Sequence, residues 1–322
     1  MIPTRSCSDL DHELDSLLSD GYRLDMIMPA DAPREAILSK DGDALRLVLS
    51  PAFRRPKSIV STAEAPVASP NNPSNSVSSL ELPAKNWTKG RAEMEYRDLM
   101  PGRLDGRLVA SHIRINNGGE VPDYVHYHKI GFQMIYCKSG WVRVVYEDQG
   151  PPFVLSVGDC VLQPPGIRHR VLEASAGTEV IEVSSPAEHE TWVDHEMILP
   201  TANLLPDRDF GGQRFVRHVA AQAEWDGSSG IKYRDTGIRT ATGIADVRVV
   251  KADATNSRFR AKAYPNGMYF IFVLKGSARL SGFEGENRML LPDDSFILSS
   301  SESLEMLLST DAELLDVALF RI

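Results

Sequence analysis

Residues 119–140 read GEVPDYVHYHKIGFQMIYCKSG, and residues 158–173 read GDCVLQPPGIRHRVLE. The first stretch is rich in aromatic and β-branched residues and carries His126 and His128 two positions apart. Side chains at positions i and i+2 of an extended strand point to the same face, so both imidazoles can reach one point in space. The second stretch adds His169 after a turn at Gly158. Three histidines in a β-rich setting indicate a site for a divalent transition metal, because neutral imidazole nitrogen suits Fe, Ni, Cu and Zn.

The spacing of these residues resembles the paired motifs of the cupin superfamily, whose members are small double-sheet β-barrels. The first motif is matched, with one extra residue after the first glycine, by Gly119, His126, His128 and Gly140. The second motif is matched without a gap by Gly158, Pro164, Gly166 and His169. Gln133 stands where the first motif usually has a glutamate. The resemblance implies a cupin barrel whose candidate metal ligands are His126, His128, Gln133 and His169.

The neutral side chain of Gln133 changes the charge expected at this site. With three neutral imidazoles and no glutamate, the metal keeps its full dipositive charge. A more positive metal favours an anionic chelating ligand, such as a carboxylate, an enolate or a phenolate. The alternative is that Gln133 lies just outside the ligand shell and hydrogen-bonds a bound water.

An internal repeat begins at Trp87. Residues 94–108, MEYRDLMPGRLDGRL, are echoed by residues 231–245, IKYRDTGIRTATGIA, and each segment follows a tryptophan, Trp87 or Trp225. Further on, FQMIYCKSGWVRV pairs with MYFIFVLKGSARL, which aligns Gly140 with Gly276. Both copies have short alternating strands and turns. The repeat therefore predicts two tandem barrels, a bicupin.

The second copy lacks the histidines. Counting from Gly276, the ligand positions are occupied by Lys262, Tyr264, Tyr269 and a residue near Leu304. An ammonium group facing a divalent cation would be repelled by it. We therefore expect only the first barrel to bind a metal, and we expect the second to serve packing, dimerisation or lid functions.

The resulting architecture is dominated by β-structure and has four parts. Residues 1–51 form a small α/β extension, predicted as helix–strand–helix–strand, with one helix from Leu10 and a second, short helix from Asp31 to Ile37. This extension either covers an interaction or dimer surface or simply packs on the barrel. Residues 52–85, rich in Pro, Ser and Asn, form a linker. Residues 86–200 form the metal-binding barrel and residues 201–322 the degenerate barrel.

Bulk composition limits the partners. The 322 residues carry a net charge of −9 with no Lys/Arg cluster, which argues against nucleic acid and anionic membranes. Residues 1–18 lack the apolar core of a secretory signal, and no apolar run approaches the roughly 18 residues that span a bilayer. The three cysteines are too widely spaced for a disulfide framework. We expect a cytoplasmic homodimer, since exposed sheet edges need cover, and a small-molecule substrate.

Three further residues are candidates for substrate binding. His112 and Arg114 share one face of the strand LVASHIRI, and Arg114 could hold a carboxylate with two parallel hydrogen bonds. The alternative for this pair is a solvated outer face. Tyr124 shares strand parity with His126 and His128 and could contact the ligand.

With a metal site in one of its two barrels, the chain resembles bicupins of the gentisate-type and quercetin-type ring-cleaving dioxygenases. The resemblance implies an Fe(II)-type dioxygenase that acts on a small anionic substrate, either an aromatic hydroxyacid or an enol or diketone. Fe²⁺ is the favoured metal, and Ni, Mn, Cu or Zn also suit the ligand set. Two alternatives stay open, because one fold hosts many chemistries: a non-redox metal-dependent isomerase or lyase, and a non-catalytic cupin that binds a small ligand or metal.

Overall fold

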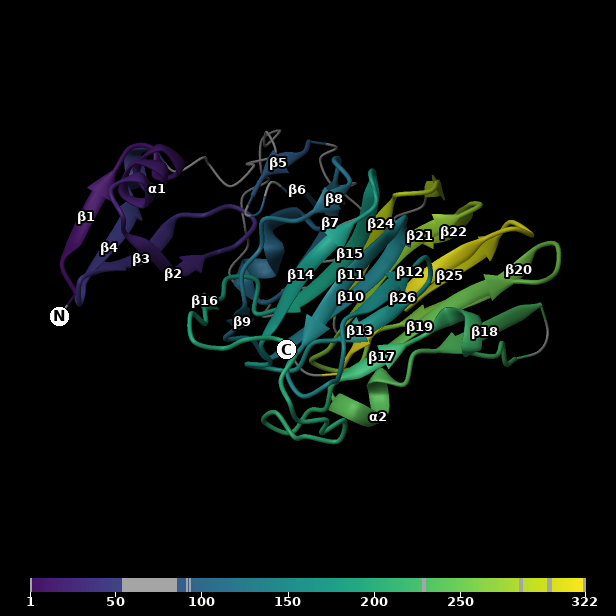
Figure 1. The fold of residues 1–322 in the computed structure, drawn as a ribbon. Coiled ribbons are helices and arrows are strands. Elements are labelled where there is room, and N and C mark those ends of the chain that lie inside the picture. The colour runs from purple at the N-terminus through teal and green to yellow at the C-terminus, as the bar shows by residue number, and fades with distance from the viewer. Residues whose placement is uncertain are drawn as a thin grey trace.

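The computed structural model describes residues 2–53, 86–90, 92, 94–227, 230–283, 286–299 and 303–320. Nearly all of the predicted linker, from residue 54 to residue 85, lies outside the described residues. The described chain is mainly β-structure arranged in three units along the sequence (Figure 1). This confirms the predicted all-β tandem architecture.

The N-terminal unit is a four-stranded sheet with one helix. Its elements are β1 (Thr4–Cys7), α1 (Leu10–Ser19), β2 (Arg23–Met28), β3 (Glu35–Lys40) and β4 (Asp43–Leu49), followed by a 3-10 turn at Pro51–Phe53. Asp9 caps α1 by accepting a hydrogen bond from the backbone of His12. The short helix expected from Asp31 to Ile37 was wrong, because residues 35–40 pair as a central strand with β2 and β4.

The first barrel consists of two facing sheets. One contains β5 (Thr88–Lys89), β6 (Glu95–Asp98), β7 (Val109–Ile115), β10 (Phe132–Ser139), β13 (Cys160–Leu162), β15 (Thr178–Ser185) and β17 (Val216–His218). The other contains β8 (Gly119–Glu120), β9 (His126–His128), β11 (Trp141–Tyr146), β12 (Phe153–Ser156), β14 (His169–Ala174) and β16 (Thr191–Val193). A turn at Pro101–Gly106 and a 3-10 turn at Ala220–Gln222 flank these strands.

The second barrel repeats this arrangement. One sheet contains β18 (Ile231–Asp235), β19 (Ala245–Ala252), β21 (Met268–Lys275), β24 (Ser295–Ser299) and β26 (Glu313–Leu319). The other contains β20 (Ser257–Lys262), β22 (Ala278–Phe283), β23 (Glu286–Leu290) and β25 (Ser303–Leu308). The short helix α2 (Ile238–Thr242) precedes β19.

The two barrels share one turn in detail, which supports the predicted alignment of Gly140 with Gly276. Both glycines have positive φ, +69° and +66°, and a Cβ at either would lie within 2.6 Å of a serine hydroxyl. That hydroxyl, on Ser175 or Ser309, accepts a hydrogen bond from the residue that follows the glycine. The preceding strands, β10 and β21, each have a bulge just before the turn. Only glycine fits this position in either copy.

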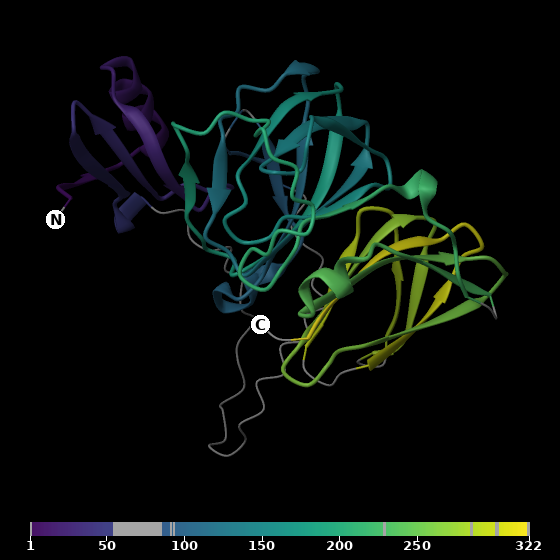
Figure 2. The ribbon, with the colours of Figure 1, turned by 60° about the horizontal axis from the view of Figure 1, so that its bottom comes forward.

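The two barrels pack against each other through one sheet from each (Figure 2). A single apolar cluster joins side chains of β7, β10, β13 and β15 to side chains of β19, β21 and β26. Tyr136, Val249 and Phe270 belong to it. The interior of the second barrel is a separate cluster that includes Tyr269 and Leu304. An apolar core between the barrels, distinct from the interior of the second barrel, therefore joins them.

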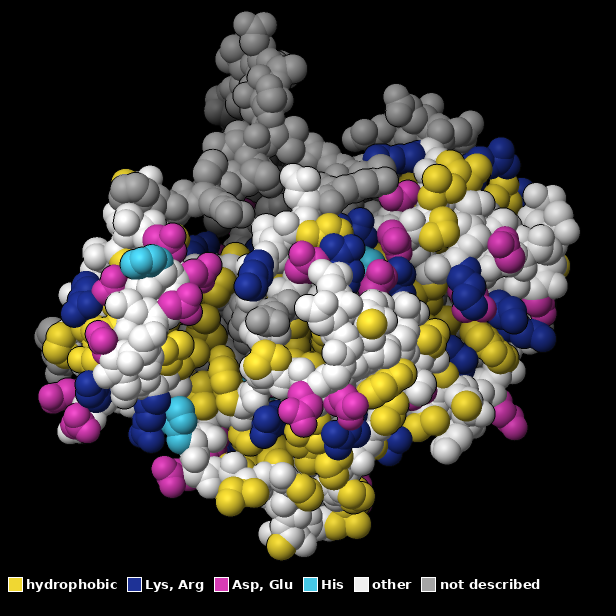
Figure 3. All heavy atoms as spheres, turned by 45° about the horizontal axis from the view of Figure 1, so that its top comes forward, with side chains coloured by type: hydrophobic (Ala, Val, Ile, Leu, Met, Phe, Trp, Pro, Cys, Tyr) yellow, Lys and Arg dark blue, Asp and Glu magenta, His cyan; other side chains and the backbone are white. Residues whose placement is uncertain are grey.

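The N-terminal sheet continues directly into the first barrel. β2 pairs with β16, and β16 pairs in turn with β9, so the strands run β1-β4-β3-β2-β16-β9-β14-β11-β12 in one sheet. On the face shown in Figure 3, positive and negative side chains are interspersed and neither sign forms a continuous patch. Among the described residues, no helix is long and apolar enough to cross a bilayer.

Candidate metal centre

The three motif histidines converge inside the first barrel. His126 and His128 begin and end β9, and His169 begins the neighbouring strand β14, where it pairs with His126. All three are buried, and one ligand atom from each lies within 4.8 Å of the others. The ring centroids of His126 and His169 are 4.2 Å apart. Strand alternation thus brings the two histidines of β9 to one face, as predicted, and antiparallel pairing adds the third.

A hydrogen bond at Nδ1 fixes the orientation of each ring. The partners are the carbonyl of Tyr124 for His126 at 2.8 Å, the hydroxyl of Thr191 for His128 at 2.9 Å and the carbonyl of Ile167 for His169 at 3.0 Å. A carbonyl only accepts, so Nδ1 of His126 and of His169 donates, which leaves Nε2 as the nitrogen that can bind a metal. This arrangement of outer hydrogen bonds is typical of histidines that bind a metal through Nε2. The residues present therefore fit a divalent metal.

Gln133 belongs to a hydrogen-bonded chain beside the histidines. Its Oε1 accepts from Nε2 of Gln163 at 3.0 Å, and its own Nε2 donates to Oε1 of Glu182 at 3.0 Å. Nε2 of Gln163 also lies 3.2 Å from Nε2 of His169. Burial raises the pKa of Tyr146, so its hydroxyl stays protonated and donates to Oε1 of Gln163 at 2.7 Å. That bond turns the Gln163 amide group toward Gln133 and His169.

A cavity of about 90 Å³ opens beside this chain. His128, Gln133, His169 and Glu182 form part of its polar wall. The apolar walls come from both sheets and from the segment before β6, and they include Met94, Val109, Ile113, Ile135, Val142, Val144, Leu155, Val171 and Val180. Asp31, from the loop between β2 and β3, also lines the cavity. The N-terminal unit therefore contributes to the wall of the site.

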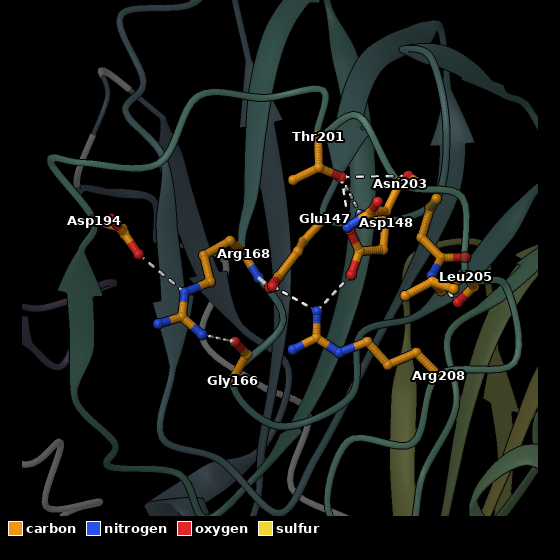
Figure 4. Close-up of polar contacts among 10 residues, drawn as sticks. Glu147, Asp148, Gly166, Arg168, Asp194, Thr201, Asn203, Leu205 and Arg208 are labelled. Atoms are coloured by element: carbon orange, nitrogen blue, oxygen red, sulfur yellow. Dashed lines mark hydrogen bonds and ion pairs between the residues drawn. The ribbon is translucent and has the colours of Figure 1, made fainter.

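Polar contacts outside the barrel hold the strand ends that carry the ligands (Figure 4). Arg168 precedes His169 and points away from the histidines, as alternation predicts. Its Nε donates to Oδ2 of Asp194 at 3.0 Å, and its guanidinium lies 4.5 Å from the ring centroid of Tyr127. The Arg168 backbone donates to Glu147 at 3.2 Å, and Glu147 accepts from Arg208 at 2.6 Å. These contacts join β14 to β9 and β16 from the outside.

Comparison with known proteins agrees with this geometry. A family model described as a cupin domain matches residues 111–184. These residues of the first barrel therefore form a cupin domain. The chain is similar in fold to a mutant of Bacillus subtilis oxalate decarboxylase OxdC, with a TM-score of 0.52 and 14% identity over 77% of this chain and 75% of that chain. Protein Ylba from E. coli has a TM-score of 0.50 and 13% identity, over 76% of this chain and 88% of that one. At these identities the likeness concerns the fold. No curated protein sequence matches this chain.

Two of the three predicted substrate-binding residues lie outside the cavity of the first barrel. Ser111, Ile113 and Ile115 line the cavity, so His112 and Arg114 occupy the opposite face of β7. His112 is 1% exposed, and its ring lies 5.8 Å from that of Phe272 in the second barrel. The expectation that these two residues bind substrate is thereby corrected. The alternative of a solvated face was also wrong for His112, because the second barrel covers it.

Arg114 and Tyr124 have other partners. Arg114 donates to Glu95 at 2.7 Å, and its guanidinium lies 4.2 Å from the ring centroid of Trp87. Tyr124 packs with its edge toward His126, at a centroid distance of 5.8 Å, and is not among the side chains that line the cavity. A role for Tyr124 in substrate binding stays a prediction.

The sequence reasoning missed three cavity residues. Gln163 and Glu182 belong to neither of the two motifs. The alternation of Val180, Glu182 and Ser184 along one strand was the signal that could have placed the Glu182 carboxylate on an inner face. His189 lies between two glutamates, a pattern typical of solvated surface, and it too belongs to neither motif. In the structure His189 is 8% exposed, lines the cavity, and its ring centroid lies 5.3 Å from that of His128.

In the second barrel the corresponding positions have different surroundings. Lys262 is exposed and Tyr264 is 42% exposed, whereas Tyr269 and Leu304 are packed in the apolar interior. The expectation that this barrel binds no metal stays a prediction.

Proposed function

We propose that the first barrel is the site of a metal-dependent enzyme for a small hydroxylated organic acid or enol, and that its reaction is an Fe(II)-type dioxygenation. The observation that carries the proposal is the convergence of three buried imidazoles, two of which, His128 and His169, line an apolar cavity. A divalent metal bound there would supply Lewis acidity, and redox chemistry if it is iron. The other contributions come from the side chains that line the cavity.

The size of the cavity limits the substrate. Its volume of about 90 Å³ is smaller than the ~150 Å³ of an engineered cavity that takes up benzene, so the substrate is no larger than about a single ring or a short acid. The walls beside Val144 and Leu155 are apolar and exclude water from the substrate. These walls favour a flat or aliphatic body over a sugar.

The position of Glu182 favours a substrate that carries a hydroxyl group. Its Oε1 already accepts hydrogen bonds from Gln133 at 3.0 Å and from Ser184 at 2.7 Å. Its Oε2 has no hydrogen-bond partner among the described residues, and Glu182 lines the cavity. A substrate hydroxyl or enol could donate to Oε2 while its oxygen faces the three imidazoles. The carboxylate also offsets part of the positive charge expected of a site with neutral ligands, which favours a monoanion over a dianion.

The test loads protein with Fe(II) under anaerobic conditions and follows oxygen uptake. The panel contains hydroxyaromatic acids, diketones and enols, with oxalate added because an oxalate decarboxylase has a similar fold. We expect uptake with at least one compound, loss of that uptake in His128→Gln, and full retention in His12→Gln, which replaces an exposed histidine of α1. Absence of uptake at full iron occupancy would exclude the dioxygenase.

A second candidate is a non-redox metal-dependent isomerase or lyase. Glu182 favours it, because the same Oε2 could take a proton from a carbon or oxygen of the substrate. Mass spectrometry of the products, performed on the same panel without oxygen, separates the two reactions. If neither assay gives a product while a compound binds, the protein is a non-catalytic ligand-binding cupin.

A further inference from the structure

A second cleft lies between the two barrels, on the outer side of the sheet whose inner side faces the metal centre. Its volume is about 250 Å³. Tyr136 and Lys138 of β10 line it from the first barrel, whereas Gln133 and Ile135 of the same strand line the inner cavity. β18, β19, β21 and β26 supply the other wall, beside the apolar cluster that joins the barrels. The cleft and the metal centre are therefore separate sites.

More cations than carboxylates line the cleft. Its charged lining consists of four cations and one carboxylate: Lys138, Arg234, Lys251, Lys275 and Glu313. Lys138 already pairs with Asp293 at 2.9 Å and with Glu179. Lys275 lies 3.4 Å from Glu313. In the described part of the chain, Arg234 and Lys251 have no carboxylate partner, so the cleft keeps two cations that nothing neutralises.

Arg234 is held in place and lacks an acceptor. Its Nε is buried and makes no hydrogen bond. Its guanidinium lies 4.7 Å from the ring centroid of Trp225, and Nζ of Lys251 lies 5.5 Å from the same ring. Gly158 lets the guanidinium approach, because a Cβ at this glycine would lie 3.2 Å from its Nη2. A buried donor without an acceptor is unfavourable, and an anion would remove that penalty.

We propose that this cleft binds a small oxyanion, a phosphate or a carboxylate, between Arg234 and Lys251. The planar guanidinium presents parallel donors that match the oxygens of either group. Lys251 adds a point charge from the neighbouring strand β19, and Trp225 forms an apolar wall beneath both cations. Because the site lies outside the first barrel, its occupancy does not depend on the metal.

Isothermal titration calorimetry in a low-salt Tris buffer tests the proposal, with inorganic phosphate and succinate as separate probes. We expect one or both to bind with one equivalent per chain, and the stronger probe identifies the ligand chemistry. Arg234→Gln should weaken binding about tenfold or more, the usual scale for a charge-assisted contact. The matched control is Arg260→Gln, which removes the same charge from an exposed position on β20. Equal weakening by both variants would show a non-specific charge effect and overturn the proposal.

A second pair of variants keeps the test valid if Arg234→Gln fails to fold. Lys251→Gln should weaken binding, and Lys262→Gln, exposed on β20, should not. Circular dichroism verifies that all four variants are folded. Binding should persist after the metal is removed with a chelator, which separates this site from the metal centre. If neither anion binds wild-type protein at millimolar concentration, or if binding disappears with the metal, the cleft is a solvent-filled gap between the barrels.

Discussion

The side-chain amide of Gln133 donates a hydrogen bond of 3.0 Å to Oε1 of Glu182. Gln133 pairs with Ser184 across β10 and β15, so Glu182, two residues earlier, faces the same side of the sheet. The carboxylate that the first cupin motif usually supplies at position 133 is therefore found one strand away. A carboxylate side chain therefore belongs to the hydrogen-bonded chain beside the three imidazoles.

Exchanging the two groups should show this coupling. Gln133→Glu places a second carboxylate within hydrogen-bonding distance of Glu182, and repulsion between the two should lower the free energy of unfolding of the metal-free protein by about 1–3 kcal/mol. The double variant Gln133→Glu with Glu182→Gln restores one amide and one carboxylate, so we expect it to recover most of that loss. Urea unfolding of all three variants measures the effect. A double variant no more stable than Gln133→Glu would contradict the coupling.

Thr191 should control metal affinity without contacting the metal. Its hydroxyl lies 2.9 Å from Nδ1 of His128, and Thr191→Val removes that group with little change in shape. Loss of such an outer hydrogen bond lowers metal affinity by roughly 10–100-fold. Thr191→Ser keeps the hydroxyl and should bind metal as the wild type does. Competition with a chelator, followed by elemental analysis, gives the metal affinities. Equal affinities for the two variants would show that the Thr191 hydroxyl does not influence metal binding.

His112 should make the protein less stable in mild acid. Burial, together with the nearby charge of Lys138, lowers the pKa of His112 from 6.5 to about 4. Between these values the unfolded chain binds a proton that the folded chain does not, so the free energy of unfolding falls as the pH decreases from 6.5 to 4. The full effect is roughly 3 kcal/mol.

Two variants test this contribution. His112→Gln should flatten the dependence of stability on pH in that window, as measured by urea unfolding at several pH values. The exposed His12 is the control, and His12→Gln should keep the wild-type slope. An unchanged slope in His112→Gln would mean that other groups cause the acid sensitivity.

The shared core predicts that the barrels unfold together. Phe270 is 0% exposed and belongs to the cluster that joins them. Phe270→Ala should lower the free energy of unfolding by about 3–5 kcal/mol. Met289→Ala, at a side chain that is 52% exposed, should change it by no more than about 0.5 kcal/mol. Circular dichroism and tryptophan fluorescence should report one transition, and two separate transitions would show that the barrels fold independently.

The sequence predicted what depends on local periodicity and motif spacing. The i, i+2 placement of His126 and His128 and the turn glycines Gly140 and Gly276 follow from strand geometry, and the structure agrees with them. Alternation correctly put His112 and Arg114 on one face of β7. It does not reveal which face is inner, and that depends on where the second barrel packs.

The cavity residues that the sequence did not reveal have the same explanation. His189 lies between two glutamates, a pattern typical of solvated surface, yet it lines the cavity. Glu182 and Gln163 meet Gln133 only through pairing with strands distant in sequence. Tertiary contacts, rather than local patterns, select these residues.

The three-residue strand β16 has neighbours on both sides. On one side it pairs with β2 of the N-terminal sheet, and on the other it pairs with β9 over its whole length, from His126 to His128. Thr191 pairs with residues on both sides, and its hydroxyl is the hydrogen-bond partner that orients His128. Shortening the protein from its N-terminus would leave β16 as a free sheet edge, and fraying there would release one imidazole from its fixed angle. The first fifty residues thus help to hold β16, and through it the ligand histidines of β9, in place.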